Sequence, residues 1–258
     1  MRIFIPTLGR EKQFTFETLP DIWKRRVIFV CGPGEKKRLQ ALGAPVWEQP
    51  AEVKGIAGVR QMIMDFAKDE KVVMLDDDLK FAHRCADGKL HPADKTVVNA
   101  MLLSVDEQLS NFAHGAVSCR EGNNRVKDDI TFIGRPLRLL AYNRRMVKET
   151  NCRFRLKVME DFDMTLQLLR AGRENFIIWN FCHDQCIGSG APGGCSGYRT
   201  PAVQAKAAHD LARLHPGFVK IVEKETKTAW KDFGGKRTDV IVYWKKAFES
   251  SQSSEQVF

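Results

Sequence analysis

The stretch Lys71-Val72-Val73-Met74-Leu75-Asp76-Asp77-Asp78-Leu79 carries four apolar residues directly into three acids. This pattern predicts a buried parallel strand that ends at the edge of a sheet. In open α/β sheets, ligands bind outside the carboxyl ends of the strands. Three carboxylates at such a place repel one another unless a cation joins them, and hard divalent cations prefer oxygen ligands. The stretch therefore indicates a metal-dependent site for a phosphorylated substrate, with an acidic loop whose Asp78 caps a helix as the alternative.

Other apolar runs alternate with amphipathic stretches along the chain. The predicted strands are 2–6, 26–31, 45–48, 72–75, 116–119, 139–142 and 176–181. The predicted helices are 35–42, 56–67, 96–112, 160–171 and 201–215. This alternation predicts a single Rossmann-like α/β domain over residues 1–248, with a mostly parallel central sheet and helices on both faces. The polar, serine-rich segment 249–258 is expected to be a disordered tail.

Size and charge limit the classes of function. The 258 residues suffice for one large domain, and the net charge of +9 with a pI near 9.2 favours a polyanionic partner, nucleic acid first. No apolar run approaches the length of a membrane span, and the first residues lack the features of a secretory signal. The seven cysteines lie mostly in apolar surroundings, as expected in a reducing compartment. We therefore expect a cytoplasmic protein that does not associate with membranes.

Two glycine-containing segments are candidate ligand contacts. Ile5–Arg10 follows the first predicted strand, where Gly9 would let the backbone approach a ligand and Arg10 could reach a phosphate. Gly55–Gln61 opens a helix, whose N-terminus attracts anions, and Arg60 lies one turn into it. Each segment alone is equally consistent with a plain turn or a closely packed helix.

Further candidates lie in the second half of the chain. Three acids, Glu160, Asp161 and Asp163, occupy a helix start, where the helix dipole favours them. Three exceed what capping needs, so one of them could be a general base beside a metal site. His183 follows an apolar strand and is a candidate metal ligand. The glycine-rich segment 188–197 is expected to fold over a substrate.

In their order along the chain, these pieces resemble the glycosyltransferase A fold, the nucleotide-sugar-dependent family with an aspartate metal motif. The resemblance spans about Met1 to Arg199. A narrower resemblance, carried by the compact size, the basic charge and the ending from His183 to Arg199, is to the TET-associated glycosyltransferases. These are phage and kinetoplastid enzymes that place sugars on hydroxymethylated bases in DNA. The chain has no Arg-Trp pair, which speaks against the processive polysaccharide synthases of this fold.

The resemblance implies roles for particular residues. It implies Mn²⁺ or Mg²⁺ at Asp78 and His183, with Asp76 on the metal, the ribose or the sugar. It implies Asp161 as the base, with Glu160 and Asp163 as alternatives. The donor, UDP-glucose or a similar UDP-sugar, would contact Pro6, Thr7, Gly9, Arg10, Arg60, Asp76 and Asp77. The reaction would invert the anomeric configuration if a base is well placed and would retain it otherwise.

The resemblance also implies an acceptor: the hydroxymethyl group of a modified pyrimidine in DNA, in the host cytoplasm if the chain is phage-encoded. The expected acceptor or DNA contacts are Arg144, Arg145, Arg153, Arg155 and Arg199. Three alternatives stay open. One is a glycosyltransferase acting on a small sugar or lipid-linked acceptor, the second is a basic nucleic-acid-binding module, and the third is a metal-dependent nuclease.

Overall fold

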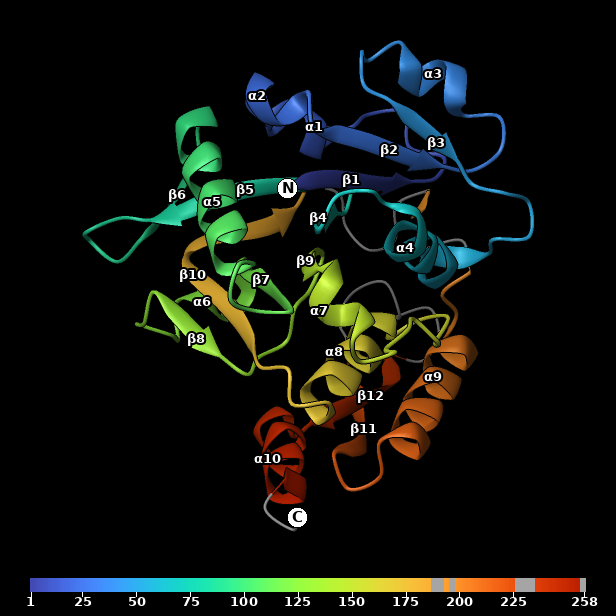
Figure 1. Cartoon of the computed structure of the whole chain (residues 1–258), viewed down its shortest axis with the longest axis vertical. Coiled ribbons are helices and arrows are strands. Elements are labelled where there is room, and N and C mark those ends of the chain that lie inside the picture. The colour runs from blue at the N-terminus through green and yellow to red at the C-terminus, as the bar shows by residue number, and fades with distance from the viewer. Residues whose placement is uncertain (187–192, 195–197, 226–234, 256–258) are drawn as a thin grey trace.

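A computed structural model of the chain describes residues 1–186, 193–194, 198–225 and 235–255. A ten-stranded sheet crosses the molecule and carries helices on both faces (Figure 1). Its strands are β1 (Arg2–Thr7), β2 (Val27–Cys31), β3 (Val46–Glu48), β4 (Lys71–Leu75), β5 (Leu79–Arg84), β6 (Leu90–Pro92), β7 (His114–Cys119), β8 (Ile130–Phe132), β9 (Leu139–Asn143) and β10 (Asn175–Gln185). A separate antiparallel pair consists of β11 (Val219–Glu225) and β12 (Lys236–Val242).

Ten helices connect and cover the strands of the described chain. They are α1 (Phe14–Thr18), α2 (Asp21–Lys24), α3 (Lys36–Gln40), α4 (Gly55–Phe66), α5 (Lys95–Gln108), α6 (Arg120–Asn123), α7 (Arg144–Lys148), α8 (Glu160–Arg170), α9 (Pro201–Leu214) and α10 (Trp244–Glu255). The longest, α5 and α9, have 14 residues. Within the described ranges, no helix combines the length and the apolar character that crossing a bilayer requires.

The strand order of the large sheet is β3-β2-β1-β4-β9-β7-β10-β5-β6, and β8 pairs with β10. Strands β3, β2, β1 and β4 are parallel to one another, and β7 and β10 are also parallel. Strand β9 is antiparallel to both of its neighbours, as β5 and β8 are to β10. Seven of the ten strands therefore point the same way, which confirms the predicted α/β class with a mostly parallel sheet.

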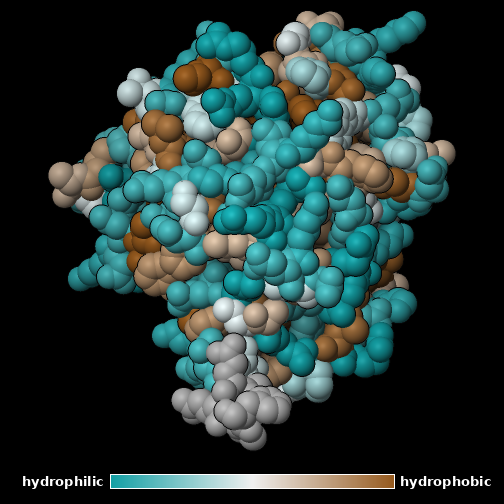
Figure 2. Space-filling view, viewed as in Figure 1, coloured by the Kyte–Doolittle hydropathy of each residue, from teal (hydrophilic) through white to brown (hydrophobic). Residues whose placement is uncertain are grey.

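Alternation along the strands builds a core on each face of the sheet. Ile3 and Ile5 pack with the apolar side of α5 on one face, whereas Phe4, between them, packs with α4 and α8 on the other. A third core joins the outer side of α8 to α9, β12 and α10. These C-terminal elements lie together at one end of the molecule (Figure 1). The face shown in Figure 2 is mostly hydrophilic, with its hydrophobic side chains in small scattered groups.

The seven predicted strands and five predicted helices are all present, with ends shifted by a few residues. The largest shifts are of four residues. Helix α5 ends at Gln108 instead of residue 112. Strand β10, predicted to end at residue 181, continues to Gln185 because it pairs with both β5 and β7. Strands β5, β6, β8, β11 and β12 were not predicted. Their sequences are short or rich in charge, and pairing with neighbours rather than an intrinsic pattern makes them strands.

The predicted disordered tail 249–258 is wrong in its first part, because α10 continues through it to Glu255. Ala247 of this helix is fully buried in the third core. The hydroxyl groups of Ser250 and Ser251 donate back to the carbonyls of Ala247 and Phe248, so these serines bond within the helix. Packing thus overrides a composition that is unfavourable for a helix. Residues 256–258 lie outside the described chain.

Candidate active site

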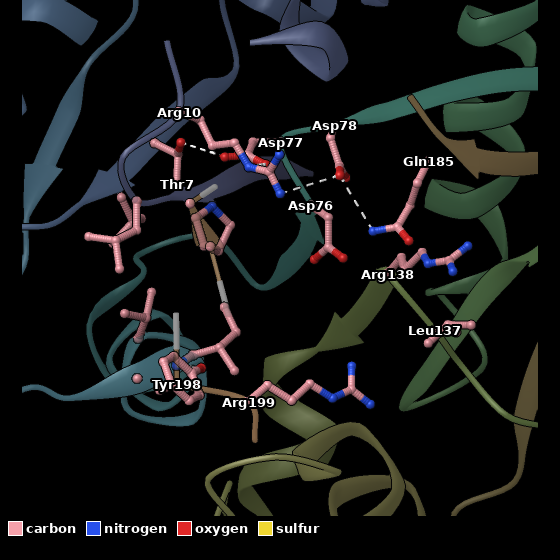
Figure 3. A pocket seen from close by; sticks show the side chains of 18 of the residues that line it. Thr7, Arg10, Asp76, Asp77, Asp78, Leu137, Arg138, Gln185, Tyr198 and Arg199 are labelled. Atoms are coloured by element: carbon pink, nitrogen blue, oxygen red, sulfur yellow. Dashed lines mark hydrogen bonds and ion pairs between the residues drawn. The ribbon is translucent and has the colours of Figure 1, made fainter. Parts of the chain in front are cut away.

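A cavity of about 390 Å³ opens where β1 and β4 end (Figure 3). The carboxyl ends of the parallel strands meet there, as expected for ligand sites in open α/β sheets. Among the described residues, eight charged side chains line it: Asp76, Asp77, Asp78, Arg10, Arg135, Arg138, Arg199 and Arg237. Five cations thus face three acids in one concave site, which suits a ligand that carries several negative charges.

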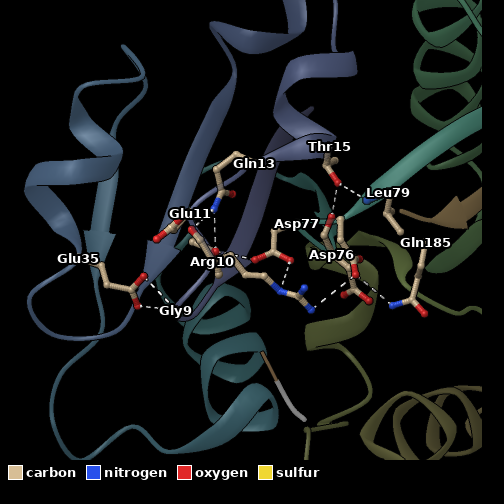
Figure 4. Close-up of polar contacts among 12 residues, drawn as sticks. Gly9, Arg10, Glu11, Gln13, Thr15, Glu35, Asp76, Asp77, Leu79 and Gln185 are labelled. Atoms are coloured by element: carbon tan, nitrogen blue, oxygen red, sulfur yellow. Dashed lines mark hydrogen bonds and ion pairs between the residues drawn. The ribbon is translucent and has the colours of Figure 1, made fainter. Parts of the chain in front are cut away.

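The acidic loop after β4 is held in place by α1 and by the loop after β1 (Figure 4). The Thr15 hydroxyl donates to the carbonyl of Asp76 over 2.5 Å and accepts from the N–H of Leu79 over 2.7 Å. The Thr7 hydroxyl donates to the Asp77 carboxylate over 2.5 Å and itself accepts from Gln13 over 2.9 Å. These hydrogen bonds hold the backbone of the acidic loop and orient the Asp77 carboxylate before any ligand binds.

The three acids are only partly neutralised. Asp76 lies 3.2 Å from Arg60, and the Arg10 guanidinium lies 3.6 Å from both Asp77 and Asp78. Burial raises the pKa of Asp76 and of Asp77 to about 6, despite these arginines, and it also raises the pKa of Asp78. Ionisation of these groups therefore costs more than it does in water, and a further cation would offset that cost.

These carboxylates fit a divalent cation that a substrate helps to hold. In the described ranges, no group of three or more His, Cys, Asp or Glu side chains forms a complete metal cage. Mg²⁺ typically takes one or two carboxylates and completes its shell with water and substrate phosphates. Asp76 and Asp78 offer such a pair of carboxylates, and burial has already removed part of their hydration.

The first loop agrees in part with its predicted role. Pro6, Thr7 and Arg10 line the cavity. Gly9 does not, and its N–H donates instead to the Glu35 carboxylate over 3.0 Å, with φ at +65°. Glycine is needed there because a side chain is strained at that φ. The predicted direct contact of Gly9 with a ligand is therefore replaced by a role in shaping the loop.

Arg60 has a different role from the predicted one. Its side chain is 6% exposed and does not line the cavity. Its guanidinium donates to Glu160 and, over 3.2 Å, to Asp76, and so it joins the acids after β4 to those at the start of α8. The prediction that Arg60 contacts a nucleotide is corrected to that of an internal counter-ion. The sequence suggested a ligand contact because an exposed and a buried arginine look alike in a helix pattern.

The three predicted acids of α8 face different surroundings. Asp161 pairs with Arg135, which lines the cavity, over 3.0 Å. Glu160 is buried with Arg60, and burial raises its pKa to about 7. Asp163 is fully buried and bonds to Arg155 and His215 away from the cavity. The predicted catalytic role of Asp163 is therefore wrong, because helical periodicity turns it to the opposite side of α8 from Asp161.

His183 is not brought to the acids. It is 0% exposed inside the sheet, it does not line the cavity, and burial lowers its pKa to about 3. Gln185, two residues later on the same side of β10, lines the cavity and donates to Asp78 over 3.5 Å. Pairing with β5 extends β10 four residues beyond its predicted end. His183 therefore lies inside the sheet and not beyond its edge, where the predicted metal contact would need it.

The arginines predicted to contact DNA divide into three groups. Arg199 lines the cavity. Arg145 and Arg153 are exposed and pair with Glu70 and Asp65. Arg144 is 6% exposed and donates to backbone carbonyls, and Arg155 is bound to Asp163, so the predicted DNA contacts of these two are corrected to structural roles. Sequence alone does not separate a buried arginine from a surface one.

Several cavity residues were not predicted. Arg135 and Arg138 precede β9, and antiparallel pairing with β4 brings that end of β9 to the acids: the Asp76 N–H donates to the Arg138 carbonyl over 3.0 Å. Tyr198 accepts a hydrogen bond from the N–H of Ile56, and Arg237 reaches the cavity from β12. The two arginines before β9 are visible in the sequence. That they line the cavity follows only from the antiparallel pairing of β9 with β4.

The glycine-rich segment 188–197, expected to fold over a substrate, lies largely outside the described residues. Gly193 and Gly194 are described, and both line the cavity. The Gly194 N–H donates to the Leu8 carbonyl over 2.9 Å, so this pair lies against the loop that carries Arg10.

Comparison with known proteins identifies the family. Residues 1–187, which include the acidic loop, the start of α8 and all of β10, match the sequence profile of the TET-Associated Glycosyltransferase family. The chain belongs to this family of glycosyltransferases. No curated protein matches the chain. Tyr198, Arg199 and Arg237 lie beyond the matched residues, so this glycosyltransferase completes its cavity with a C-terminal part outside the family profile.

Solved structures share the fold. S. aureus TarS 1–349 in complex with UDP-GlcNAc superposes with a TM-score of 0.52 at 14% identity, covering 83% of this chain and 66% of the TarS 1–349 fragment. The glycosyltransferase therefore spans slightly less than two thirds of that fragment. Glucosyl-3-phosphoglycerate synthase from Mycobacterium tuberculosis, in complex with Mn²⁺, UDP and phosphoglyceric acid, has a TM-score of 0.51 at 11% identity, covering 93% of this chain and 86% of the synthase. At these identities the likeness establishes the glycosyltransferase A fold alone.

Proposed function

We propose that this glycosyltransferase moves a sugar from a UDP-sugar to the hydroxymethyl group of a modified pyrimidine in DNA, with Mn²⁺ or Mg²⁺ at its site. The observation that carries the proposal is the cavity at the ends of β1 and β4, where the carboxylates of Asp76, Asp77 and Asp78, the last two of them buried, face five arginines of the described chain. Its volume of about 390 Å³ lies in the range of roughly 300–1,000 Å³ common for small-molecule sites. Two structures of the same fold contain UDP or a UDP-sugar, which supports this choice of donor.

The donor's diphosphate is the part best matched by the cavity. Arg138, Arg199 and Arg237 line it, and guanidinium groups bind phosphate oxygens with paired, charge-assisted hydrogen bonds. Asp76 and Asp78 would hold the divalent cation, which supplies neutralisation of the charge that develops on the departing diphosphate. Pro6 and Thr7 form the wall at the end of β1, where the nucleoside would lie. These residues bind and orient the donor so that its anomeric carbon faces the acceptor.

Asp161 is the proposed base for the acceptor hydroxyl. It lies at the start of α8 and is separated from the cavity by its partner Arg135, which lines the wall. The Arg135 guanidinium also stacks 3.6 Å from the centre of the Phe162 ring, so its position is fixed from two sides. In this proposal Arg135 turns to the bound acceptor and leaves the Asp161 carboxylate free to take the hydroxyl proton. The hydroxyl oxygen then attacks the anomeric carbon as the diphosphate leaves, with inversion.

A DNA acceptor is supported by charge rather than by a visible groove. The net charge is +9, and exposed Arg145 and Arg153 add to the positive potential, although each has an acidic partner. A base inside a duplex would have to be turned out of the stack to reach the cavity. DNA binding through phosphates should weaken steeply as salt is added, whereas binding of a small neutral acceptor should not.

The test is UDP release from UDP-glucose with Mn²⁺, measured with DNA that contains hydroxymethylcytosine and with the same DNA sequence unmodified. Release that depends on the modified base would support donor and acceptor together. Slow release that ignores DNA would keep the donor and remove the acceptor. No release with any common nucleotide sugar would remove the proposal. NMR of the anomeric proton in the product would decide between inversion and retention.

A further inference from the structure

Arg10 occupies the place among the acids where a bound cation is expected. Its Nε lies 3.6 Å from Asp77 Oδ1, and its Nη2 lies 3.6 Å from Asp78 Oδ2 (Figure 3). The side chain is 12% exposed. Its Nε and Nη1 are buried and have no hydrogen-bond partner among the described residues. The guanidinium is therefore attracted to the acids as a charge but is not bonded to them.

The same chain shows what a fully formed arginine–aspartate pair looks like. Arg155 donates to both oxygens of Asp163, over 3.0 Å from Nε and 2.5 Å from Nη2. That two-pronged geometry is the strong form of the interaction. At 3.6 Å from each acid, Arg10 gives up the hydrogen bonds and keeps only the Coulomb attraction. Because no hydrogen bond to the acids is lost, a divalent cation can replace the Arg10 guanidinium at a small cost in free energy.

A tight backbone contact covers Arg10 from the other side. A Cβ added to Gly193 would lie 2.9 Å from the Leu8 carbonyl and 3.3 Å from the Cγ and Cδ atoms of Arg10. Gly193 has φ at +95°, so a side chain there would also be strained. The absence of a side chain lets the glycine pair lie directly on the aliphatic part of Arg10. Gly194 lies beside the guanidinium, because a Cβ added there would lie 3.6 Å from Nη2 of Arg10. Arg10 still forms part of the cavity wall.

We propose that Arg10 is a resident counter-ion of the acids after β4, and that an arriving divalent cation displaces it from Asp78. The argument rests on the metal dependence in the proposed function. In the donor-free protein, Arg10 limits repulsion between the carboxylates. When the divalent cation binds, the guanidinium moves the short distance into the cavity, where phosphate oxygens of the donor are its natural partner. Arg10 and the metal thus compete for one site, and negative coupling of this kind works in both directions.

The test is a Mn²⁺ titration of the protein without donor, followed by electron paramagnetic resonance of free Mn²⁺. Arg10→Met removes the charge at similar length, Arg10→Lys keeps it, and Arg145→Met removes one exposed charge as the matched control. We expect Arg10→Met to bind Mn²⁺ roughly tenfold more tightly than the unaltered chain, in line with typical coupling energies. Arg10→Lys and Arg145→Met should stay close to the unaltered chain. Adding Asp78→Asn to Arg10→Met should remove the gained affinity.

Three outcomes would overturn the proposal. Equal or weaker Mn²⁺ binding by Arg10→Met would show that Arg10 does not compete with the metal, while metal dependence itself would stand. An equal gain in Mn²⁺ affinity in Arg145→Met would show that the gain comes from the lower net charge and not from the position of Arg10. If no variant binds Mn²⁺ and UDP release is unchanged in EDTA, the protein does not depend on a metal. Competition between Arg10 and a metal is then ruled out, whereas the proposed glycosyl transfer is not. Melting temperatures measured with and without Mn²⁺ would separate a folding defect from a change in affinity.

Discussion

Two buried acidic sites in this protein are stabilised in opposite ways. Asp163, on α8, accepts hydrogen bonds from Arg155, from His215 over 2.8 Å and from Gln167 over 2.9 Å. Burial alone would raise its pKa, but these partners lower it below the ordinary value. In the loop after β4, hydrogen bonds hold the Asp76 carbonyl and the Asp77 carboxylate. Even so, burial keeps the pKa values of Asp76, Asp77 and Asp78 raised.

The difference separates an acid that serves the fold from acids that await a ligand. At Asp163 every lone pair that faces the protein is used, so the carboxylate fastens α8 to the end of α9. Beside β4, like charges lie together in a site open to solvent, which costs stability until a cation binds. Strain of this kind at a cavity is what a pre-organised binding site requires. Substitutions at each site in turn test whether the two groups of acids differ in this way.

The largest effect is expected for Asp78→Ala. Loss of a carboxylate that holds a catalytic cation removes several kcal/mol of charge stabilisation, so UDP release should fall by about a thousandfold or more. The melting temperature should stay the same or rise, because a buried repulsion is relieved. Unchanged turnover together with a lower melting temperature would make the acids after β4 structural, like Asp163.

The reverse pattern is expected for Asp163→Asn. Breaking this buried pair should cost about 3 kcal/mol, near the low end for such pairs because Arg155 reaches solvent. In a chain of this size that lowers the melting temperature by about 6–12 °C. Turnover per folded molecule should remain within a few-fold of the unaltered chain. Asp210→Asn changes a partly exposed acid paired with the exposed side chains of Lys206 and Arg213; it serves as the control and should leave stability almost unchanged.

The pH dependence of stability should have opposite signs at the two sites. Asp76 and Asp77 have folded pKa values of about 6, above the ordinary aspartate value of 3.8, so the stability they contribute is present at low pH and lost as pH rises toward and through 6. Asp163 has a lowered pKa, so its contribution is present above 3.8 and lost as pH falls.

Urea unfolding in EDTA at pH 4.5 and pH 7 tests this difference. Relative to the unaltered chain, Asp76→Asn/Asp77→Asn should gain more stability at pH 7 than at pH 4.5. In a second series with Mn²⁺ in place of EDTA, the metal should stabilise the unaltered chain more at pH 7 than at pH 4.5, because it binds the ionised acids. A pH profile that the double substitution leaves unchanged would contradict the raised pKa values.

The smallest effects are expected for the two glutamines. Gln167→Ala loses a 2.9 Å hydrogen bond to Asp163 and should cost about 1 kcal/mol of stability. Gln185→Ala loses only a 3.5 Å contact with Asp78, so stability should change by less than about 0.5 kcal/mol. Turnover by Gln185→Ala should fall by about tenfold or less. A large loss of Mn²⁺ affinity in Gln185→Ala would instead give this amide a place at the metal.

Much of the fold was predictable because its periodic patterns are strong. The run Lys71–Leu75 and its acids specify a buried strand with a polar end, and the amphipathic helices specify which faces are covered. Some strands, such as β5 and β8, were not predicted because they form only by pairing with β10. The serine-rich part of α10 was not predicted as a helix either, because that helix depends on the tertiary packing of the buried Ala247.

The sequence by itself determined the α/β class, the acidic loop after β4 and the general place of the site, because these follow from local patterns and from the rule that ligands bind at strand ends. Tertiary structure decided which charged groups face the cavity. Asp161 and Asp163 are two residues apart on one helix, yet one pairs with a cavity arginine and the other is locked in the core. Arg138 and Arg237 reach the acids only through the direction of β9 and the placement of β12. Such choices depend on contacts between segments far apart in the chain, which no local pattern encodes.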